Sequence, residues 1–347
     1  MPAEFSVPFR LGTFSFAGRA PFPALVLGQH AYALEMLEPL LHRSSLRLSG
    51  AHSMMALLSD WPANFEALQT AASLLADDRD AAAAGIDGMP LEQLNVHTPV
   101  QMPRQIFCTI ANYRSHIIDT VRDPAATPGL SEPDPPECLA RAAQIIEERL
   151  QGHPYVCLKL PTTVSGPMDP LQIPHDAQRT DWELELGVVM GAACRRVSRE
   201  HAMQFVAGYV LVNDITVRER VARPDLPRLG TDWLQSKNAP GFLPTGPYLI
   251  PAAFVPDVDA IRLTLSLNGQ VMQDALVSDM MFSIAAQIEY ISQHAQLLPG
   301  DLICTGTPAG CGTRYKRFLR PGDIIDACAE GLGAQRTRCV AESDPTS

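Results

Sequence analysis

The sequence lacks the features that mark membrane proteins and nucleic-acid-binding proteins. No window reaches the roughly 18 apolar residues that a membrane helix needs, and no run is rich in Lys or Arg. The 38 Asp and Glu residues outnumber the 27 Lys and Arg residues, which gives a formal net charge of -11. Because an acidic chain repels polyanions, we expect neither a nucleic acid nor a membrane surface as a partner.

Paired cysteines and an export signal are also missing. The eight cysteines include no CxxC pair, and several lie in apolar stretches such as Val156-Cys157-Leu158. In a chain of 347 residues they are typical of buried, reduced thiols rather than of a disulfide framework. Residues 1–9 show no basic segment followed by an apolar one. We therefore expect a cytoplasmic protein.

The chain is long enough for two domains, since a single core usually stops growing at about 250–300 residues. Residues 1–95 combine short apolar runs with an Ala- and Leu-rich stretch of helical period at Asn64–Ala76, and they hold no reactive cluster. The segment Asp77–Gly88, rich in Asp, Ala and Gly, is predicted to be a loop that closes this part. We predict a smaller N-terminal domain of uncertain role at residues 1–95.

From Gln105 onward the sequence changes to short β-branched strands separated by turns. The predicted strands are Val156–Leu160, Leu186–Met190, Gly208–Asn213, Ile261–Leu267, Asp301–Thr305 and Asp323–Ala327, with an Asn268-Gly269 turn after the fourth. Few helices separate them; the clearest are Glu137–Leu150 and Met281–Leu298. This pattern favours an α+β fold with a mixed, β-rich sheet over a doubly wound sheet.

A proline-rich segment precedes the first of these helices. Arg122–Pro136 carries five prolines among acidic and small residues, so it cannot continue a helix and is not expected in a core. It is either a plain linker or part of a loop that covers a site.

Acidic and apolar residues alternate in Asp181-Trp182-Glu183-Leu184-Glu185-Leu186. On a strand of period two, Asp181, Glu183 and Glu185 share one face, so two carboxylates lie side by side. Such a pair supplies oxygen ligands for a hard cation, although a solvated strand face gives the same pattern.

A further acid, Asp214, ends the apolar run Gly208–Asn213. Asp is depleted within strands, so it marks a strand end or a functional point. It is either a simple cap for the segment that follows or the third carboxylate of a cation site with Glu183 and Glu185.

Three further stretches hold residues with possible roles in catalysis. His116 and Asp119 share a face if their segment is helical, and the carboxylate can then orient the imidazole as a general base; a surface pair is the alternative. Lys237 lies in a polar turn, where it is either solvated or beside an anionic intermediate. The turn Thr305–Gly312 lacks the Gly-Lys-Ser/Thr of a phosphate loop, so exposure of Thr307 and backbone N–H groups to a ligand is the better interpretation.

Together these stretches resemble the fumarylacetoacetate hydrolase family from about residue 104 to 335. The shared motifs, in the family's order, are Asn112-Tyr113 with His116, Leu158–Thr163 with its Lys159, Glu183-Leu184-Glu185, Val212–Arg218, Ser236-Lys237, Leu267-Asn268-Gly269, and Pro299-Gly300-Asp301 leading to Gly306–Gly310. The resemblance implies a catalytic domain with a rolled mixed sheet at residues 104–340, preceded by the variable N-terminal domain of longer members. It also implies a lid at about residues 112–152 and, usually, a homodimer.

The resemblance also implies site residues and a cofactor. Members bind Mg²⁺ or another divalent cation through the residues that are Glu183, Glu185 and Asp214 here; carboxylates also admit Mn²⁺ and Ca²⁺. Two departures concern the lid. Asp119 replaces a Glu that the family often has, and the insertion from Arg122 to about Gly152 is longer than in compact members.

The resulting functional prediction is an enzyme that hydrolyses a carbon-carbon bond in a 1,3-dicarbonyl, acylpyruvate-like acid. His116, oriented by Asp119, is expected to deprotonate water, and Lys237 to stabilise the developing charge. The predicted substrate-binding residues are Arg218, Thr307, Lys159 and Tyr113. The alternatives are a 2-oxo acid decarboxylase, a dienoate hydratase or isomerase at the same site, or a non-catalytic binding protein on this fold.

Overall fold

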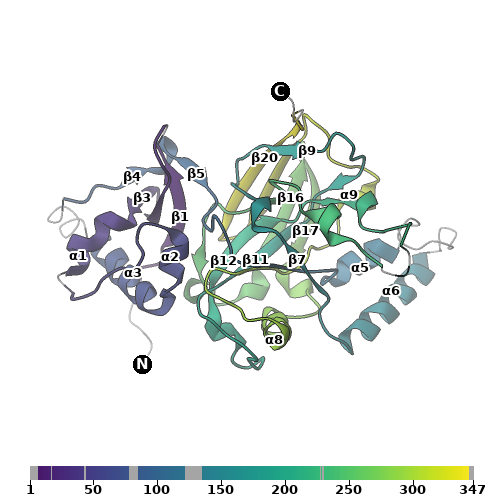
Figure 1. Ribbon diagram of the computed structural model, residues 1–347, viewed down its shortest axis with the longest axis horizontal. Helices are drawn as coiled ribbons and strands as arrows, with labels where there is room; N and C mark the ends of the chain where they lie inside the picture. The colour runs from purple at the N-terminus through teal and green to yellow at the C-terminus, as the bar shows by residue number, and fades with distance from the viewer. Residues whose placement is uncertain are drawn as a thin grey trace.

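The computed structural model describes residues 7–16, 18–42, 44–77, 85–121, 135–226, 228 and 230–343. It has a smaller N-terminal part beside a larger part that contains the remaining sheets (Figure 1). The prediction of an α+β fold with a β-rich part and a smaller N-terminal region is confirmed. The domain boundaries near residues 95 and 104 stay predictions.

The N-terminal part is a five-stranded sheet covered by short helices. Its strand order is β4-β3-β2-β1-β5, with β1 at Arg10–Ser15, β2 at Phe22–Leu27, β3 at His30–Ala33, β4 at Met89–Pro90 and β5 at Asn95–His97. The helices are α1 (Glu38–His42), α2 (Met54–Leu58) and α3 (Trp61–Leu75). Helix α3 contains the predicted stretch except Ala76, which caps its end, and it buries one face because its apolar residues recur every three or four positions. Of the predicted loop Asp77–Gly88, residues 78–84 lie outside the described residues.

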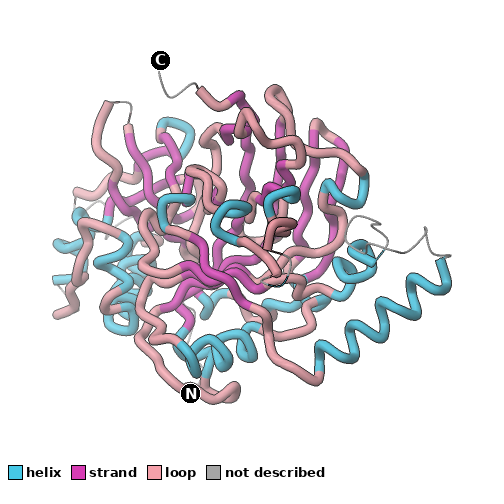
Figure 2. The backbone as a smooth tube through the Cα atoms, turned by 45° about the vertical axis from the view of Figure 1, so that its right-hand side comes forward, coloured by secondary structure: helices cyan, strands magenta, loops and turns pink. Residues whose placement is uncertain are grey.

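A six-stranded mixed sheet forms the centre of the larger part. Its order is β15-β12-β11-β18-β6-β7, with β6 at Ile106–Thr109, β7 at Val156–Lys159, β11 at Leu184–Met190, β12 at Val206–Asn213, β15 at Ile250–Pro251 and β18 at Leu302–Cys304. Neighbouring strands are antiparallel except β18 and β6, which are parallel. Figure 2 shows these strands crossing the middle of the molecule, with α6 (Pro135–Leu150) as the long helix at its side.

A second sheet of five strands packs against the first. Its order is β17-β16-β19-β20-β9, with β9 at Leu171–Ile173, β16 at Arg262–Leu267, β17 at Gln270–Leu276, β19 at Ile324–Ala329 and β20 at Gly333–Ala341. The Asn268-Gly269 turn between β16 and β17 has positive φ at both residues, as a two-residue hairpin requires. Smaller pairs are β8 (Val164–Ser165) with β14 (Leu243–Pro244), and β10 (Thr180–Asp181) with β13 (Thr216–Val217).

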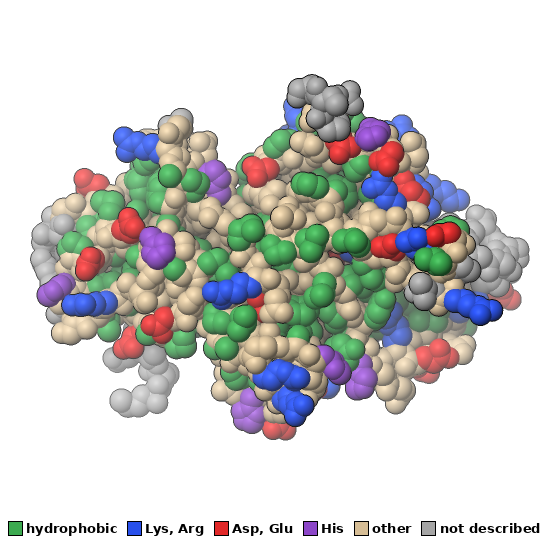
Figure 3. Space-filling model, viewed as in Figure 1, with side chains coloured by type: hydrophobic (Ala, Val, Ile, Leu, Met, Phe, Trp, Pro, Cys, Tyr) green, Lys and Arg blue, Asp and Glu red, His purple; other side chains and the backbone are tan. Residues whose placement is uncertain are grey.

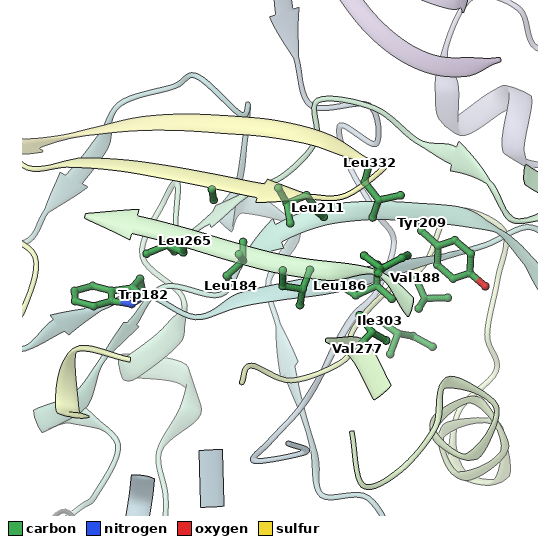
Figure 4. Packing of buried hydrophobic residues seen from close by; sticks show 14 of the residues in the cluster. Trp182, Leu184, Leu186, Val188, Tyr209, Leu211, Leu265, Val277, Ile303 and Leu332 are labelled. Atoms are coloured by element: carbon green, nitrogen blue, oxygen red, sulfur yellow. The ribbon is translucent and has the colours of Figure 1, made fainter. Parts of the chain in front are cut away.

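The period of β11 divides the core into two layers. Leu184, Leu186 and Val188 belong to a cluster shared with Leu265 of β16 (Figure 4). Val189, on the other face of β11, belongs to a second cluster that includes side chains of the N-terminal helices. The six-stranded sheet is therefore buried on both faces, which fixes the side on which each residue of β11 lies.

The remaining helices deviate from the predictions in small ways. Helix α8 spans Ile284–His294; it starts later than the predicted Met281 because the Ser283 hydroxyl caps its start, and it ends before the predicted Leu298. Helix α6 starts at Pro135, so the last two residues of the proline-rich segment lie in a helix, contrary to the prediction; proline is tolerated in a first turn, where its missing N–H is not needed. Residues 122–134 of that segment lie outside the described residues.

All eight cysteines are described, and all are free thiols. Seven are buried, but Cys328 is exposed because it points outward from β19, so the prediction of buried thiols fails there. Within the described residues, no helix combines the length and apolar character that crossing a membrane requires.

Candidate active site

Three buried carboxylates converge where β11 begins and β12 ends. Glu183 precedes β11, Glu185 is its second residue, and Asp214 follows β12. The two strands are antiparallel, with Leu184 opposite Asn213, so these strand ends are neighbours. One oxygen from each carboxylate lies within 4.8 Å of the others. The structure therefore brings together the three predicted metal ligands.

The alternation of acidic and apolar residues at 181–186 predicted one continuous strand, but the backbone leaves the strand between Asp181 and Leu184. Asp181 belongs to β10, while Trp182 and Glu183 are in neither strand. The prediction that three acids share the face of one strand is therefore wrong: only Glu185 lies on β11, Glu183 directly precedes it, and Asp181 belongs to β10. Its carboxylate instead accepts hydrogen bonds from the backbone N–H of Gly312 (2.6 Å) and from Arg218 Nε (2.8 Å).

Two lysines hold the carboxylates in place. Lys237 ends α7 (Trp233–Lys237), and its buried Nζ lies 2.8 Å from Glu183 Oε2 and 2.6 Å from Asp214 Oδ2. Lys159 Nζ, on β7, lies 2.6 Å from Asp214 Oδ1. Lys237 is buried, so the solvated alternative is excluded. The two ammonium groups neutralise the negative charges of Glu183 and Asp214.

The three carboxylates differ in their electrostatic surroundings. Burial opposes ionisation of Glu183, but Arg218 and Lys237 outweigh it and lower the pKa of Glu183 to about 2. Burial, Asp214 and Glu183 raise the pKa of Glu185 well above its usual range. Glu185 accepts a hydrogen bond from the backbone N–H of Gly306 at 2.7 Å. A divalent cation would favour ionised Glu185, and three hard oxygen donors suit Mg²⁺ or Mn²⁺, so the residues fit such an ion.

Arg218 offers one nitrogen for a further partner. Its Nη1 lies 2.6 Å from Glu183 Oε1 and its Nε binds Asp181, which fixes the plane of the guanidinium group. Its Nη2 is buried and has no hydrogen-bond partner among the residues that the structure describes. A buried, unsatisfied donor is costly, so a ligand oxygen there would be stabilised.

These groups surround a cavity of about 50 Å³. Its lining residues are Thr109, Ile110, Ala111, His116, Glu183, Glu185, Arg218, Trp233, Lys237 and Thr307. By the rule of about 10–15 Å³ for one water, the space holds a few waters or a small polar group. A larger surface hollow of about 520 Å³, lined by residues such as Glu35 and His42, lies in the N-terminal part, away from the carboxylate cluster.

His116 and Asp119 both lie on α5 (Arg114–Val121), as the helical interpretation required. His116 lines the cavity, and burial lowers its pKa to about 4, so its imidazole is neutral near pH 7. Asp119 Oδ2 accepts a hydrogen bond from the backbone N–H of Gly310 (2.9 Å), and Oδ1 lies 3.2 Å from Arg314 Nε. The orientation of His116 by Asp119 stays a prediction.

Two predicted substrate-binding residues have different surroundings. Thr307 lines the cavity, and its hydroxyl donates to Leu184 O (3.0 Å) and accepts from Gln273 Nε2 (2.9 Å). Tyr113 is completely buried in the core cluster and is not among the described residues that line the cavity. The substrate-binding roles of Thr307, Tyr113, Lys159 and Arg218 stay predictions.

Sequence analysis missed several residues of the site. Ile110, Ala111 and Trp233 line the cavity without reactive side chains, and no pattern marked them. Cys311 was given no role, although its position between Gly310 and Gly312 in the glycine-rich turn was a signal. Its Sγ lies 3.9 Å from His116 Nδ1.

Comparison with known proteins gives a consistent family. The chain is 39% identical over 186 residues to a 2,4-didehydro-3-deoxy-L-rhamnonate hydrolase of a Sphingomonas species, covering 53% of this chain and 64% of that relative. The match thus spans less than two thirds of that relative's length. A crystal structure of a probable 2-hydroxyhepta-2,4-diene-1,7-dioate isomerase from Mycobacterium abscessus is similar, with a TM-score of 0.66, 27% identity, and coverage of 97% of this chain and 100% of that chain.

A maleylpyruvate hydrolase from a Sphingobium species, crystallised with manganese(II) and pyruvate, shares the fold. Its TM-score is 0.67 at 24% identity, with coverage of 96% of this chain and 100% of that chain. The family model described as the C-terminal domain of fumarylacetoacetate (FAA) hydrolase matches residues 105–340. Because this match covers more than half of the sequence and includes all the carboxylates of the site, the chain belongs to the fumarylacetoacetate hydrolase family.

Proposed function

We propose that the protein is a divalent-metal-dependent hydrolase that cleaves a carbon-carbon bond in a 1,3-dicarbonyl, acylpyruvate-like acid. The observation that carries the proposal is one small cavity lined by Glu183, Glu185, a neutral histidine and an arginine with an unsatisfied nitrogen. The relative named as a hydrolase of a 2,4-didehydro-3-deoxy sugar acid supports this substrate class.

Glu183, Glu185 and Asp214 would hold the metal ion, with Mg²⁺ or Mn²⁺ as the first candidates and Ca²⁺ as a further one. When bound, such an ion supplies Lewis-acid polarisation of a substrate oxygen. The hydrogen bond from Gly306 and the ion pairs of the lysines hold these carboxylates near one another.

The substrate's carboxylate would bind Arg218. The Nη2 group is buried, lacks a partner among the described residues and belongs to a guanidinium group whose other nitrogens are fixed. A charge-assisted hydrogen bond to a carboxylate satisfies it and orients the dicarbonyl group in the cavity.

His116 would act as the general base. Its imidazole is neutral near pH 7, so it can take a proton from a water molecule that attacks the distal carbonyl. The positive charge of Lys237, which lines the same cavity, would stabilise the oxygen on which negative charge develops. Thr307 would donate to that oxygen by turning its hydroxyl away from Leu184 O. Ile110 and Trp233 would exclude bulk water from that oxygen.

The test is hydrolysis of an acylpyruvate by purified protein that has been stripped of metal and resupplied with Mg²⁺ or Mn²⁺. We expect metal-dependent release of pyruvate and a second carboxylic acid in equal amounts. Glu183→Ala should lose turnover by at least the order of 10²-fold, because it removes a ligand and the partner of Lys237 and Arg218. Asp274→Ala, which breaks only a surface pair with Arg262, is the matched control. Full metal-dependent turnover by Glu183→Ala would defeat the proposal.

A second candidate is isomerisation or decarboxylation of a related 2-oxo acid at the same site. The similarity to a probable dienoate isomerase at 27% identity favours it. An acylpyruvate, oxaloacetate and a hydroxydienoate, offered separately with Mg²⁺, discriminate between the reactions, because only hydrolysis of the acylpyruvate yields two carboxylic acids.

A further inference from the structure

Three consecutive residues of the loop that follows β18, at positions 309–311, contact side chains of helix α5. Ser115 Oγ accepts a hydrogen bond from the backbone N–H of Ala309 (3.1 Å). Asp119 accepts one from the backbone N–H of Gly310 at 2.9 Å. Between these two contacts on the helix, His116 Nδ1 lies 3.9 Å from the sulfur of Cys311. The helix that carries the proposed base is therefore docked on the loop that carries this thiol.

The position of Cys311 is fixed by its neighbours on both sides. Trp182 Nε1 donates to Gly310 O (3.0 Å), and the Asp181 carboxylate binds the backbone N–H of Gly312 (2.6 Å). A Cβ at Gly310 would lie 1.9 Å from Met272 O, and one at Gly312 would lie 2.2 Å from Arg317 O. Both positions therefore require glycine. The backbone on either side of Cys311 is thus held by close packing and hydrogen bonds.

Three polar groups contact the thiol: Gln273 Nε2, which donates to the sulfur (3.9 Å), Pro308 O and His116 Nδ1. Cys311 is 2% exposed, and its sulfur lies 3.9 Å from Pro308 O, to which the S–H can donate. The sulfur can also accept a hydrogen bond from His116, since a thiol is a weak acceptor as well as a weak donor. Burial raises the pKa of Cys311 well above its usual range, so the thiol stays protonated.

We propose that Cys311 is a positioning residue for His116: its sulfur accepts the Nδ1–H of the neutral imidazole and leaves the lone pair of Nε2 for the cavity. This assignment rests on the proposed function, in which His116 takes a proton from water. A base needs its free lone pair on the side of the substrate, and the hydrogen bond of the other nitrogen decides which tautomer is present. The contacts of Asp119 with Gly310 and Arg314, together with that of Ser115 with Ala309, hold the helix on the loop.

The tautomer can be measured without turnover. In metal-free protein with ¹⁵N-labelled histidine, long-range proton–nitrogen correlation NMR should place the proton of His116 on Nδ1, with the signal assigned by its loss in His116→Gln. Cys311→Ala and Cys311→Val remove the acceptor and should give a mixture of tautomers, whereas Cys311→Ser should keep the Nδ1–H form. Both Cys311→Ala, with a smaller side chain than cysteine, and Cys311→Val, with a larger one, lack the acceptor, so the test does not depend on either variant folding alone.

The kinetic readout separates this inference from the proposed function. Cys311→Ala or Cys311→Val should lower kcat by about 10-fold with KM and metal dependence unchanged, a part of the 10²–10⁴-fold that a general base supplies. Cys311→Ser should recover most of the loss, and Cys339→Ser, another buried cysteine on β20, should change nothing. A proton on Nε2 in the unaltered protein, or an unchanged tautomer and kcat in both variants without an acceptor, would overturn the role of Cys311. Absence of acylpyruvate turnover in the unaltered protein would defeat the proposed function and leave the tautomer measurement valid.

Discussion

At the scale of single residues, Glu185 differs from the other carboxylates of the site. Lys237 binds both Glu183 and Asp214, and Lys159 binds Asp214. Burial and the two neighbouring acids raise the pKa of Glu185, so its ionisation in the metal-free protein costs stability. A bound cation would therefore stabilise the ionised form of Glu185 more than that of Glu183 or Asp214.

This asymmetry predicts opposite effects of Glu185→Gln with and without metal. The amide keeps an acceptor for Gly306 N–H and removes a carboxyl group whose ionisation is opposed by burial, so the metal-free variant should melt about 2–4 °C higher than the unaltered protein. Saturating Mg²⁺ or Mn²⁺ should raise the Tm of the unaltered protein by mass action but leave that of the variant unchanged. Differential scanning calorimetry measures both. A metal-induced shift of equal size in both proteins would rule out Glu185 as a ligand.

His116 predicts a pH dependence of stability. Its pKa is lowered from 6.5 to about 4 in the fold by burial, so between these values the unfolded chain holds more protons than the folded one. The free energy of unfolding should therefore fall as the pH decreases from 6.5 toward 4. Between pH 7 and pH 5 this residue should contribute a loss of about 2 kcal/mol.

Urea denaturation of metal-free protein at pH 7 and pH 5 measures this dependence. His116→Gln removes the titrating group, so its loss of stability over the same interval should be smaller by that amount. His201→Gln, which changes an exposed histidine, is the control. Identical losses for the unaltered protein and His116→Gln would show that His116 does not titrate in this way.

At the scale of elements, α5 connects the base to the rest of the site. It packs with α6 and with Met281 and Phe282, which precede α8, in a hydrophobic cluster of its own. Asn112, just before α5, donates to Phe282 O (3.0 Å) and to Thr305 O (2.9 Å). The start of the helix is therefore tied to the core, and its middle is tied to the 309–312 loop by Asp119.

We expect Asp119→Ala to loosen this helix without unfolding the protein. Loss of the hydrogen bond to Gly310 should speed backbone hydrogen exchange across residues 114–121 and lower kcat by about 10-fold through a less fixed His116. Asp119→Glu, which has a longer side chain with the same charge, tests the geometry. Asp326→Ala, at a surface pair with Arg336, is the control. Unchanged exchange and activity in both Asp119 variants would contradict the role of this contact.

At the scale of the whole molecule, the edge of the six-stranded sheet suggests how copies of the chain associate. Strand β7 is the last strand of that sheet, and Leu158 is 64% exposed on it. Leu234 of the neighbouring α7 is 68% exposed. Hydrophobic side chains gather on the face shown in Figure 3, over the region where Figure 1 draws β7. Exposed edge strands with apolar side chains are usually covered by a partner.

We therefore predict a homodimer that uses this edge. Light scattering coupled to gel filtration should give twice the mass of 37.7 kDa, and Leu158→Glu together with Leu234→Glu should shift it to the monomer. Val271→Glu, at another exposed apolar residue on β17, should leave the dimer intact. A monomeric unaltered protein, or a dimer that persists in the double variant, would contradict the prediction.

Much of the fold follows from local patterns in the sequence. The predicted strands from Val156 onward are present with small shifts of their ends, because each is a short apolar or alternating run and turns separate them. The Asn268-Gly269 hairpin forms because both residues adopt positive φ readily. The break at Trp182 could not be predicted, because the alternation of acidic and apolar residues continues across it while the backbone leaves the strand.

The sequence alone determined which residue types could carry the chemistry: paired acids before an apolar strand, an acid after another strand, and a histidine on a short helix. Tertiary structure decided which of them meet. Lys237 binds carboxylates 54 and 23 residues away, and Cys311 reaches a histidine 195 residues away. Local patterns report only on neighbours in the chain, whereas hydrogen bonds and charges act through space, so these pairings exist only after the sheets and helices have packed.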